Sequence, residues 1–274
     1  MSRARFSDLG ARVATAAVGL PLLLAGLLLG PPILAVAIVA AAVLLGASEL
    51  FTLLAAGGIA PSRAAGFLLV SAVFVDVARP GLFPASAWPV VAVVAMGSML
   101  IRSRDIALAV PAGAGTVLGA AYLGGLGGSI AALRVLDPVE LGAWRLLLLL
   151  AIVMGADTAA FFVGSAVGRR KLAPALSPGK TVEGLLGGLA GGVLGALAVR
   201  WAGLRSLPLA HVVGLGLGVT ALGTAGDLAE SLLKRWAGVK DSGKLFPGHG
   251  GMLDRLDSLL FAGPVLYYYF VQAR

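Results

Sequence analysis

Long apolar runs separated by short polar segments make up most of the chain. Because about 20 consecutive apolar residues are needed to cross the hydrocarbon core of a bilayer, each run is a candidate membrane span. The candidate spans are residues 12–30, 33–55, 64–79, 87–101, 106–128, 142–167, 182–203, 207–233 and 257–272. The third and the fourth of them are short. We therefore predict an all-α fold, that of a polytopic integral membrane protein with about nine transmembrane helices.

Lysine and arginine are divided unequally between the two sides that these spans define. If the amino terminus is cytoplasmic, fifteen of these residues fall on the cytoplasmic side and six on the other side. Loops that remain in the cytoplasm carry the excess of basic residues. We therefore predict a protein of a bacterial-type inner or plasma membrane, with its amino terminus in the cytoplasm and its carboxyl terminus outside.

The composition supports a membrane protein and narrows its partners. Charged residues are 12% of the 274 residues, and the mean hydropathy is +0.98, whereas about 25% of residues are charged in soluble domains. The net charge of +8 comes from basic residues in short loops, so anionic lipid headgroups and phosphorylated substrates are expected as partners, and nucleic acid is not. The chain contains no cysteine, which excludes disulfide bonds and thiolate metal sites.

The expected organisation is a single transmembrane domain over residues 1–274. Residues 1–140 are expected to form amino-terminal helices that have little motif content and serve packing and lipid contact, and residues 141–274 to form the catalytic half. Six glycines of the seventh span have small-xxx-small spacings that allow close helix contact. They are Gly184, Gly187, Gly188, Gly191, Gly192 and Gly195. This contact could lie within the chain or between protomers, which leaves a homodimer open.

The densest polar stretch is residues 231–257, which read SLLKRWAGVKDSGKLFPGHGGMLDRLD. A cluster of this kind is costly beside a bilayer, so we interpret it as part of an active site on the cytoplasmic side. Six acids from five different segments fall toward the cytoplasmic ends of their spans, and we expect them to share a pocket. They are Glu49, Asp157, Glu183, Asp227, Asp254 and Asp257. Asp76 falls at the opposite end and is excluded.

Three of these acids are candidate metal ligands. Asp254 and Asp257 are three residues apart and share a helix face, and Asp227 ends the preceding span. Carboxylate oxygens, substrate phosphates and water are the ligands that Mg²⁺ prefers. The alternative is that Asp254 forms a salt bridge with Arg255 or a nearby lysine.

Several basic residues are candidate phosphate ligands. Lys240 and Lys244 flank a glycine in the loop before the last span, where backbone N–H groups can also approach anionic oxygens. His249 lies between two glycines, where it could bond a phosphate or a metal-bound water. Lys180 belongs to SPGKT, which is either an ordinary helix start or a phosphate site, and both can hold.

Asp157 lies inside an apolar helix, in GADTAAFFVG. A buried, unpaired charge is prohibitive there. This residue must therefore bind a cation or a base, or pair with a lysine of the pocket.

The segment from residue 231 onward resembles the signature of phosphatidate cytidylyltransferase, also called CDP-diacylglycerol synthase. Two upstream pieces agree with it, GADTAAFFVGSAVGRRKLAPALSPGKTVEG and GDLAES. The resemblance covers about residues 155–260, and the first five spans match only in hydropathy. One departure is Phe161-Phe162, where the family is expected to have an Ala-Tyr pair. The signature positions in place are Ser231, Lys234, Arg235, Lys240, Asp241, His249, Gly250, Gly251, Asp254, Arg255 and Asp257.

The resemblance implies a membrane enzyme of phospholipid biosynthesis that converts phosphatidic acid and CTP to CDP-diacylglycerol and pyrophosphate. The implied cofactor is Mg²⁺, with a second cation left open. As a hypothesis, metal binding is assigned to Asp227, Asp254 and Asp257, and Lys240 and His249 join them as catalytic residues. Substrate binding is assigned to Lys180, Glu183, Ser231, Lys234, Arg235, Lys244, Arg255 and Asp157.

Two other functions are compatible with parts of the pattern. A polyprenol or phytol kinase would share the metal site but transfer a terminal phosphoryl group, and the length of the signature argues against it. An ion-coupled transporter would use Asp157 and Glu49 as a pathway. Against a transporter, the polar residues crowd one membrane face, and no inverted repeat is visible.

Overall fold

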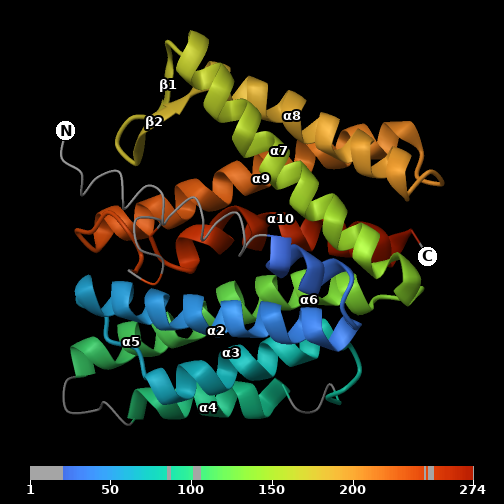
Figure 1. The fold of residues 1–274 in the computed structure, drawn as a ribbon. Coiled ribbons are helices and arrows are strands. Elements are labelled where there is room, and N and C mark those ends of the chain that lie inside the picture. Colours follow the sequence, from blue (N-terminus) through green and yellow to red (C-terminus); the bar gives the residue numbers. More distant parts are fainter. Residues whose placement is uncertain (1–20, 85–87, 101–105, 244, 246–249, 274) are drawn as a thin grey trace, which may run out of the picture.

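The computed structural model describes residues 21–84, 88–100, 106–243, 245 and 250–273. Its helices lie side by side in one bundle, and a small hairpin stands at one end (Figure 1). The helices are α2 (Pro32–Ala56), α3 (Arg63–Ala78), α4 (Trp88–Leu100), α5 (Ile106–Gly119), η2 (Ala120–Leu126), α6 (Gly127–Val135), η3 (Val139–Leu141), α7 (Gly142–Val167), α8 (Val182–Ala202), α9 (Leu209–Trp236) and α10 (Leu253–Gln272). The hairpin strands are β1 (Lys171–Ala173) and β2 (Ser177–Thr181).

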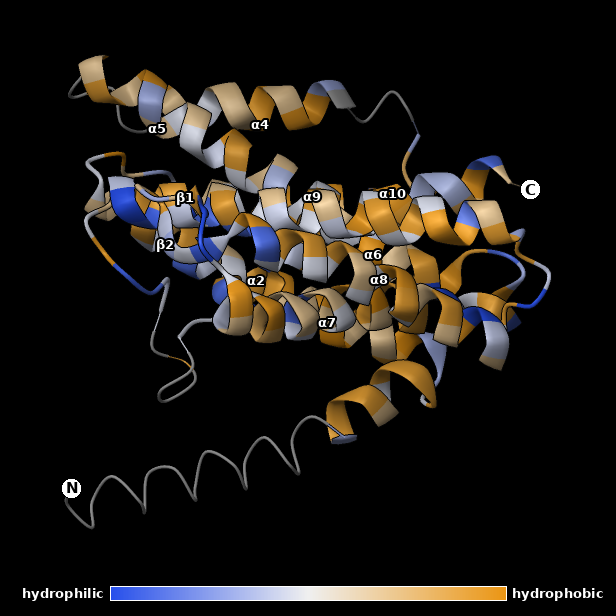
Figure 2. Ribbon diagram, turned by 90° about the horizontal axis from the view of Figure 1, so that it is seen from above, coloured by the Kyte–Doolittle hydropathy of each residue, from blue (hydrophilic) through white to orange (hydrophobic). Residues whose placement is uncertain are grey.

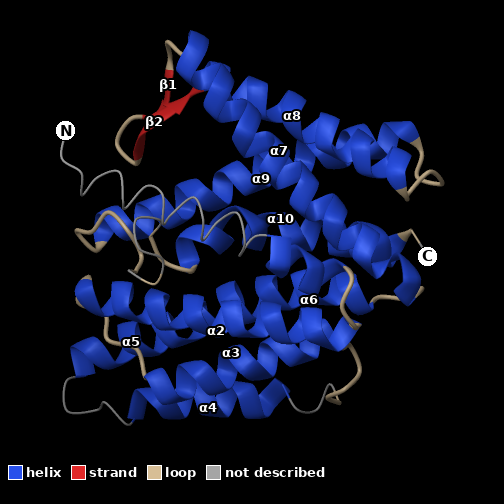
Figure 3. Cartoon of the chain, in the orientation of Figure 1, coloured by secondary structure: helices blue, strands red, loops and turns tan. Residues whose placement is uncertain are grey.

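Five of the described helical segments are long and apolar enough to cross a membrane. They are Pro32–Ala56, Ile106–Val135, Val139–Val167, Val182–Ala202 and Leu209–Trp236. Figure 3 shows helices joined by loops, with the hairpin as the strand structure of the described residues, and the protein is an all-α membrane protein. The predicted count of about nine spans is not confirmed. Residues 12–20 of the first predicted span, 12–30, lie outside the described residues, and residues 21–28 of it are helical.

The fifth predicted span is longer than hydropathy indicated. It continues from α5 through the π-helical segment η2 into α6 and ends at Val135. The glycines of η2 and α6 explain the close approach of α3, because a side chain at Gly124 or Gly128 would meet the backbone carbonyl of Val70 or Phe74. Small residues therefore decide where this helix packs, and hydropathy alone does not report that.

The polar connections gather at the two ends of the bundle. The hairpin and the segment that leads into α10 lie at one end, and residues 136–141 and 203–208 lie at the other (Figure 1). Figure 2 shows the hydrophilic colour concentrated at these ends, with apolar helices between them. Large apolar side chains on the outside of the bundle, among them Val93, Leu194 and Trp201, are exposed, as expected for helices that face lipid.

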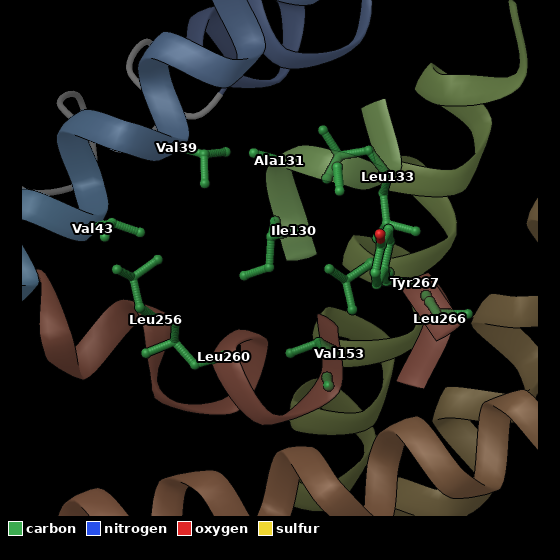
Figure 4. Packing of buried hydrophobic residues seen from close by; sticks show 14 of the residues in the cluster. Val39, Val43, Ile130, Ala131, Leu133, Val153, Leu256, Leu260, Leu266 and Tyr267 are labelled. Atoms are coloured by element: carbon green, nitrogen blue, oxygen red, sulfur yellow. The ribbon is translucent and has the colours of Figure 1, made fainter. Parts of the chain in front are cut away.

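The hydrophobic core lies between α2, α6, α7 and α10. Figure 4 shows Val43 of α2, Ile130 of α6, Val153 of α7 and Leu260 of α10 turned toward one another. All four side chains are buried. This core joins the amino-terminal helices to the last helix, so α10 is held from both halves of the chain.

The glycine stripe of the seventh span packs against helices of the same chain. A side chain at Gly191 would meet the backbone of Gly155 on α7, and one at Gly195 would overlap the carbonyl oxygen of Ala151. Gly192 faces Thr220 of α9. The predicted close contact is therefore confirmed within the chain, and these glycines carry no argument for a dimer.

Replacing Gly195 with alanine is expected to destabilise the protein. Alanine gains about 1 kcal/mol of helix propensity over glycine, but the added methyl group would overlap the Ala151 carbonyl, and overpacking costs about 1–3 kcal/mol. Gly218 of α9 is the matched control, since a methyl group there meets nothing within 4 Å. Thermal unfolding in detergent should rank Gly218→Ala at or above the native protein and Gly195→Ala below it. The reverse order would contradict close packing of α7 and α8.

Candidate functional site

The hairpin that joins α7 to α8 is fixed by hydrogen bonds at its base. The strands are antiparallel, with Lys171 opposite Thr181. Thr181 is the N-cap of α8, and its hydroxyl accepts a hydrogen bond of 3.0 Å from the Gly184 N–H, so the predicted helix start is confirmed. The Glu183 carboxylate accepts hydrogen bonds of 3.0 and 3.2 Å from the backbone N–H groups of Arg169 and Arg170. Glu183 thus closes the hairpin.

A cavity of about 460 Å³ lies between α7, the hairpin, α8 and α9, within the range of about 300–1,000 Å³ that is typical of small-molecule sites. Its polar lining includes Asp157 of α7, Lys180 of β2, and Thr224 and Asp227 of α9. Glycine and alanine form much of the α7 and α8 walls, and their small side chains leave space for a ligand.

An ion pair stands in this cavity. The Lys180 ammonium lies 2.5 Å from an Asp227 carboxylate oxygen, and both side chains are about a quarter exposed, at 27% and 28%. Ser231, one turn along α9, donates a longer hydrogen bond of 3.4 Å to Asp227. Lys180 also lies within electrostatic range of Asp157. The cavity therefore combines one cation with two carboxylates, and Lys180 can turn from Asp227 to an anionic ligand.

The two phenylalanines that depart from the expected family pattern lie differently relative to the cavity. Phe161 lines the cavity, whereas Phe162 is 63% exposed and is not among the lining residues. The cavity wall at position 161 is therefore an apolar ring without a hydroxyl group.

Asp254 is held by donors on both of its oxygens. One oxygen accepts a hydrogen bond of 2.6 Å from the Lys234 ammonium. The other accepts hydrogen bonds of 3.0 Å from the Ser242 N–H, 2.9 Å from the Ser242 hydroxyl and 2.7 Å from the Gly251 N–H. Burial disfavours the charged carboxyl, but these hydrogen bonds outweigh burial and lower the pKa of Asp254 to about 2. Asp254 is therefore ionised, and it holds Ser242 and Gly251, two residues of the loop that joins α9 to α10.

Lys234 bridges two carboxylates at the end of α9. Its ammonium lies 2.6 Å from Asp254 and 2.7 Å from Glu230. The Glu230 side chain is 0% exposed, and the contact is ionic, because neither Glu230 oxygen has a partner with hydrogen-bond geometry among the described residues. Lys234 thus compensates the charge of a buried carboxylate, and it is not among the residues that line the cavity.

The remaining predicted residues are spread around these two groups. Arg235 donates a 3.3 Å hydrogen bond to the carbonyl oxygen of Leu176, which ties the end of α9 to the hairpin. Lys240 and Arg255 are exposed. Asp257 is half-buried on α10, within electrostatic range of Asp227. Two further predicted residues, Lys244 and His249, lie outside the described residues.

The expectation of one shared acidic pocket is corrected by this geometry. Asp157 and Asp227 line the cavity, whereas Asp254 joins the Lys234 network, and Glu183 faces the hairpin backbone. Like charges repel, and Asp254, Glu183 and Asp227 each have a separate donor or cation. The Asp254–Lys234 pair matches the salt bridge that the sequence left as the alternative to metal binding.

The predicted metal triad is not assembled either. Within residues 21–84, 88–100, 106–243, 245 and 250–273, no three Asp, Glu or His side chains come close enough together to hold a metal ion. Asp254 is instead engaged by Lys234 on one oxygen and by Ser242 and Gly251 on the other. The carboxylates left for a metal are Asp227 and Asp257, with Asp157 near them.

Two polar residues were not assigned to the site from the sequence. Ser242 binds Asp254 through both its N–H and its hydroxyl. Glu230, one turn after Asp227, is the buried partner of Lys234. The signal for Glu230 was its position four residues before a lysine on the same helix, which is the spacing of an ion pair.

Comparisons with known proteins show what the chain is similar to. The model of the Cytidylyltransferase family matches residues 10–272. An uncharacterized protein of Escherichia coli, YnbB, is 45% identical over 136 residues, which are 48% of this chain and 44% of that protein. The phosphatidate cytidylyltransferase of Bacillus subtilis is 44% identical over 117 residues, which are 43% of this chain and 44% of that protein.

A third relative has the same name as the Bacillus subtilis protein. The phosphatidate cytidylyltransferase of Haemophilus influenzae is 43% identical over 138 residues, or 49% of this chain and 48% of that protein. In all three comparisons, the matched region spans less than half of the relative's own length.

Proposed function

The chain belongs to the Cytidylyltransferase family, and we therefore propose that it is a membrane nucleotidyltransferase that makes CDP-diacylglycerol and pyrophosphate from phosphatidic acid and CTP. The observation that carries the proposal is the cavity in which Lys180 pairs with Asp227. A cation that is held by a carboxylate inside a ligand-sized cavity suits a phosphorylated substrate. The relatives with this activity in their names support the same choice.

The proposed reaction joins two phosphates. A phosphate oxygen of phosphatidic acid attacks the α-phosphorus of CTP and forms a new P–O bond. The bond from the α-phosphorus to the oxygen that bridges it to the β-phosphorus breaks, and pyrophosphate leaves with that electron pair. The nucleophile is already an anion, so no proton has to be removed. Catalysis then consists of positioning and charge neutralisation.

The residues of the cavity supply both the positioning and the charge neutralisation. Lys180 neutralises substrate phosphate when it turns from Asp227, and Asp227 holds the ammonium in place until then. Arg235, near the end of α9, and Lys240, in the loop that follows α9, are exposed cations that can attract the triphosphate. We retain Lys244, His249 and Arg255 as proposed phosphate ligands, together with Ser231, which contacts Asp227.

We also propose Mg²⁺ as the cofactor, with Asp227 and Asp257 as the residues that would hold it. Mg²⁺ is usually bound by one or two carboxylates together with substrate phosphates, so a site without three protein carboxylates is suitable. Asp257 lies within electrostatic range of both Asp227 and Asp157, and a cation would relieve this repulsion. When bound, a divalent cation stabilises charge on the transferring and leaving oxygens.

The same proposal includes an orientation. The end of the bundle with the hairpin and the cavity faces the cytoplasm, where CTP is available, and the carboxyl terminus lies outside. The excess of lysine and arginine in the loops of that end supports this orientation.

The position of a label in CTP tests the reaction. With phosphatidic acid present, label at the α-phosphorus is expected in the lipid and label at the γ-phosphorus in pyrophosphate. A kinase would instead put the γ label into lipid, which would overturn the proposal. Failure of the purified protein to consume CTP with phosphatidic acid would do the same. Protein boiled before the assay is the control for chemical transfer.

A further inference from the structure

A polar contact joins the amino-terminal helices to the loop before α10. Glu49 on α2 is half-buried and lies about 200 residues from its partners in sequence. One carboxylate oxygen accepts a hydrogen bond of 3.0 Å from the Met252 N–H. The other accepts hydrogen bonds of 2.8 Å from the Leu253 N–H and 2.9 Å from the Ser242 hydroxyl. Glu49 therefore contacts Ser242, which lies in the connection between α9 and α10, and the N-cap and first residue of α10, Met252 and Leu253.

The contact is favourable for two physical reasons. The first N–H groups of a helix have no partner within the helix, and Glu49 accepts from two of them at the start of α10. A negative charge at a helix N-terminus is also stabilised by the helix dipole. The carboxylate thus fixes where α10 begins.

Two glycines of the loop make room for this carboxylate. A side-chain carbon at Gly243 or at Gly251 would overlap the oxygens of Glu49. Neither glycine has a positive φ angle, so close approach, and not backbone conformation, accounts for glycine at these positions. Glycine at positions 243 and 251 thus leaves the space that the Glu49 carboxylate occupies.

Ser242 connects Glu49 to Asp254. Its hydroxyl lies 2.9 Å from an oxygen of Glu49 and 2.9 Å from an oxygen of Asp254. A hydroxyl has one proton, so it donates to one carboxylate at a time and links the two. Asp254 in turn binds Lys234 at the end of α9. The network therefore runs from α2 through the loop to α9.

We infer that Glu49 is a positioning residue for the proposed reaction: it holds the loop before α10 in place and, through Ser242, orients Asp254. This inference rests on the proposed function. It gives a role in the active site to residues 1–140, which the sequence assigned to packing and lipid contact. Glu49 acts through the loop and is not expected to touch either substrate.

Hydrogen exchange on the full-length protein in detergent tests the inference directly. In Glu49→Ala, the backbone amides of residues 250–254 should exchange at least about tenfold faster, and turnover should fall by about 10–100-fold, because a displacement of about 1 Å caused by a substitution far from the reacting atoms can cost about 100-fold in rate. Glu49→Gln keeps the size of the side chain but only one carbonyl oxygen, so it should lie between Glu49→Ala and the native protein. Glu49→Asp should restore part of the turnover.

Val39→Ala is the matched control, since Val39 is a buried core residue of the same helix. It should lower the melting temperature without faster exchange at residues 250–254 and without the loss of turnover. Unchanged exchange in Glu49→Ala would overturn the inference, and so would faster exchange with native turnover. If the native protein made no CDP-diacylglycerol while Glu49→Ala still exchanged faster, the proposed function would fail and the loop contact would stand.

Discussion

Replacing Asp227 with asparagine is expected to lower CDP-diacylglycerol formation by about 10³-fold. Asp227 holds the Lys180 ammonium at 2.5 Å and is one of the two proposed carboxylates for Mg²⁺. Loss of charge stabilisation at a phosphoryl group costs several kcal/mol, and about 1.4 kcal/mol corresponds to a factor of ten in rate. The measurement is initial rate with saturating CTP and phosphatidic acid, at matched amounts of folded protein.

Asp76→Asn is the matched control for this substitution. Asp76 is also an acid within a helix of the bundle, α3, but it is not among the residues that line the cavity. Its replacement should leave the rate within about twofold of the native rate, because surface and remote substitutions usually change little. A native rate in Asp227→Asn would show that the cavity pair takes no part in the reaction. The melting temperature of both variants should stay close to that of the native protein.

Hydropathy predicted the long helices because crossing a bilayer requires about 20 apolar residues in a row. The predicted span 182–203 is observed as α8 (Val182–Ala202), and 33–55 is observed as α2 (Pro32–Ala56). The polar ends were less well predicted. Helix α9 continues to Trp236, three residues past its predicted end, because Lys234 finds carboxylates there and need not reach water.

The distribution of the acids could not be predicted from the sequence, because it depends on contacts between distant segments. Hydropathy placed Glu49 and Asp254 at one membrane face, but not the hydrogen bonds of Glu49 to the backbone of α10. The cavity pair has the same origin, since Lys180 and Asp227 meet only when the hairpin folds over α9. Charge and spacing thus identify candidate residues, and the packing of helices decides their partners.

Replacing Lys234 with methionine is expected to destabilise the fold by about 3–5 kcal/mol, the usual cost of removing one member of a buried ion pair. Methionine fills a similar volume but leaves Glu230 and Asp254 without their cation. Asp254 would keep its hydrogen bonds from Ser242 and Gly251. Glu230, which is 0% exposed, would have no compensating partner among the described residues. The measurement is the free energy of unfolding in mixed micelles.

Adding Glu230→Gln to Lys234→Met separates charge from packing. If the cost comes from the uncompensated Glu230 carboxylate, the double variant should recover at least half of the lost stability, because the neutral amide is much cheaper to bury. Lys240→Met is the control for loss of a lysine charge, since Lys240 is exposed, and it should change stability by no more than about 0.5 kcal/mol. A Lys234→Met variant as stable as this control would show that the ammonium between Glu230 and Asp254 does not hold the end of α9 to α10.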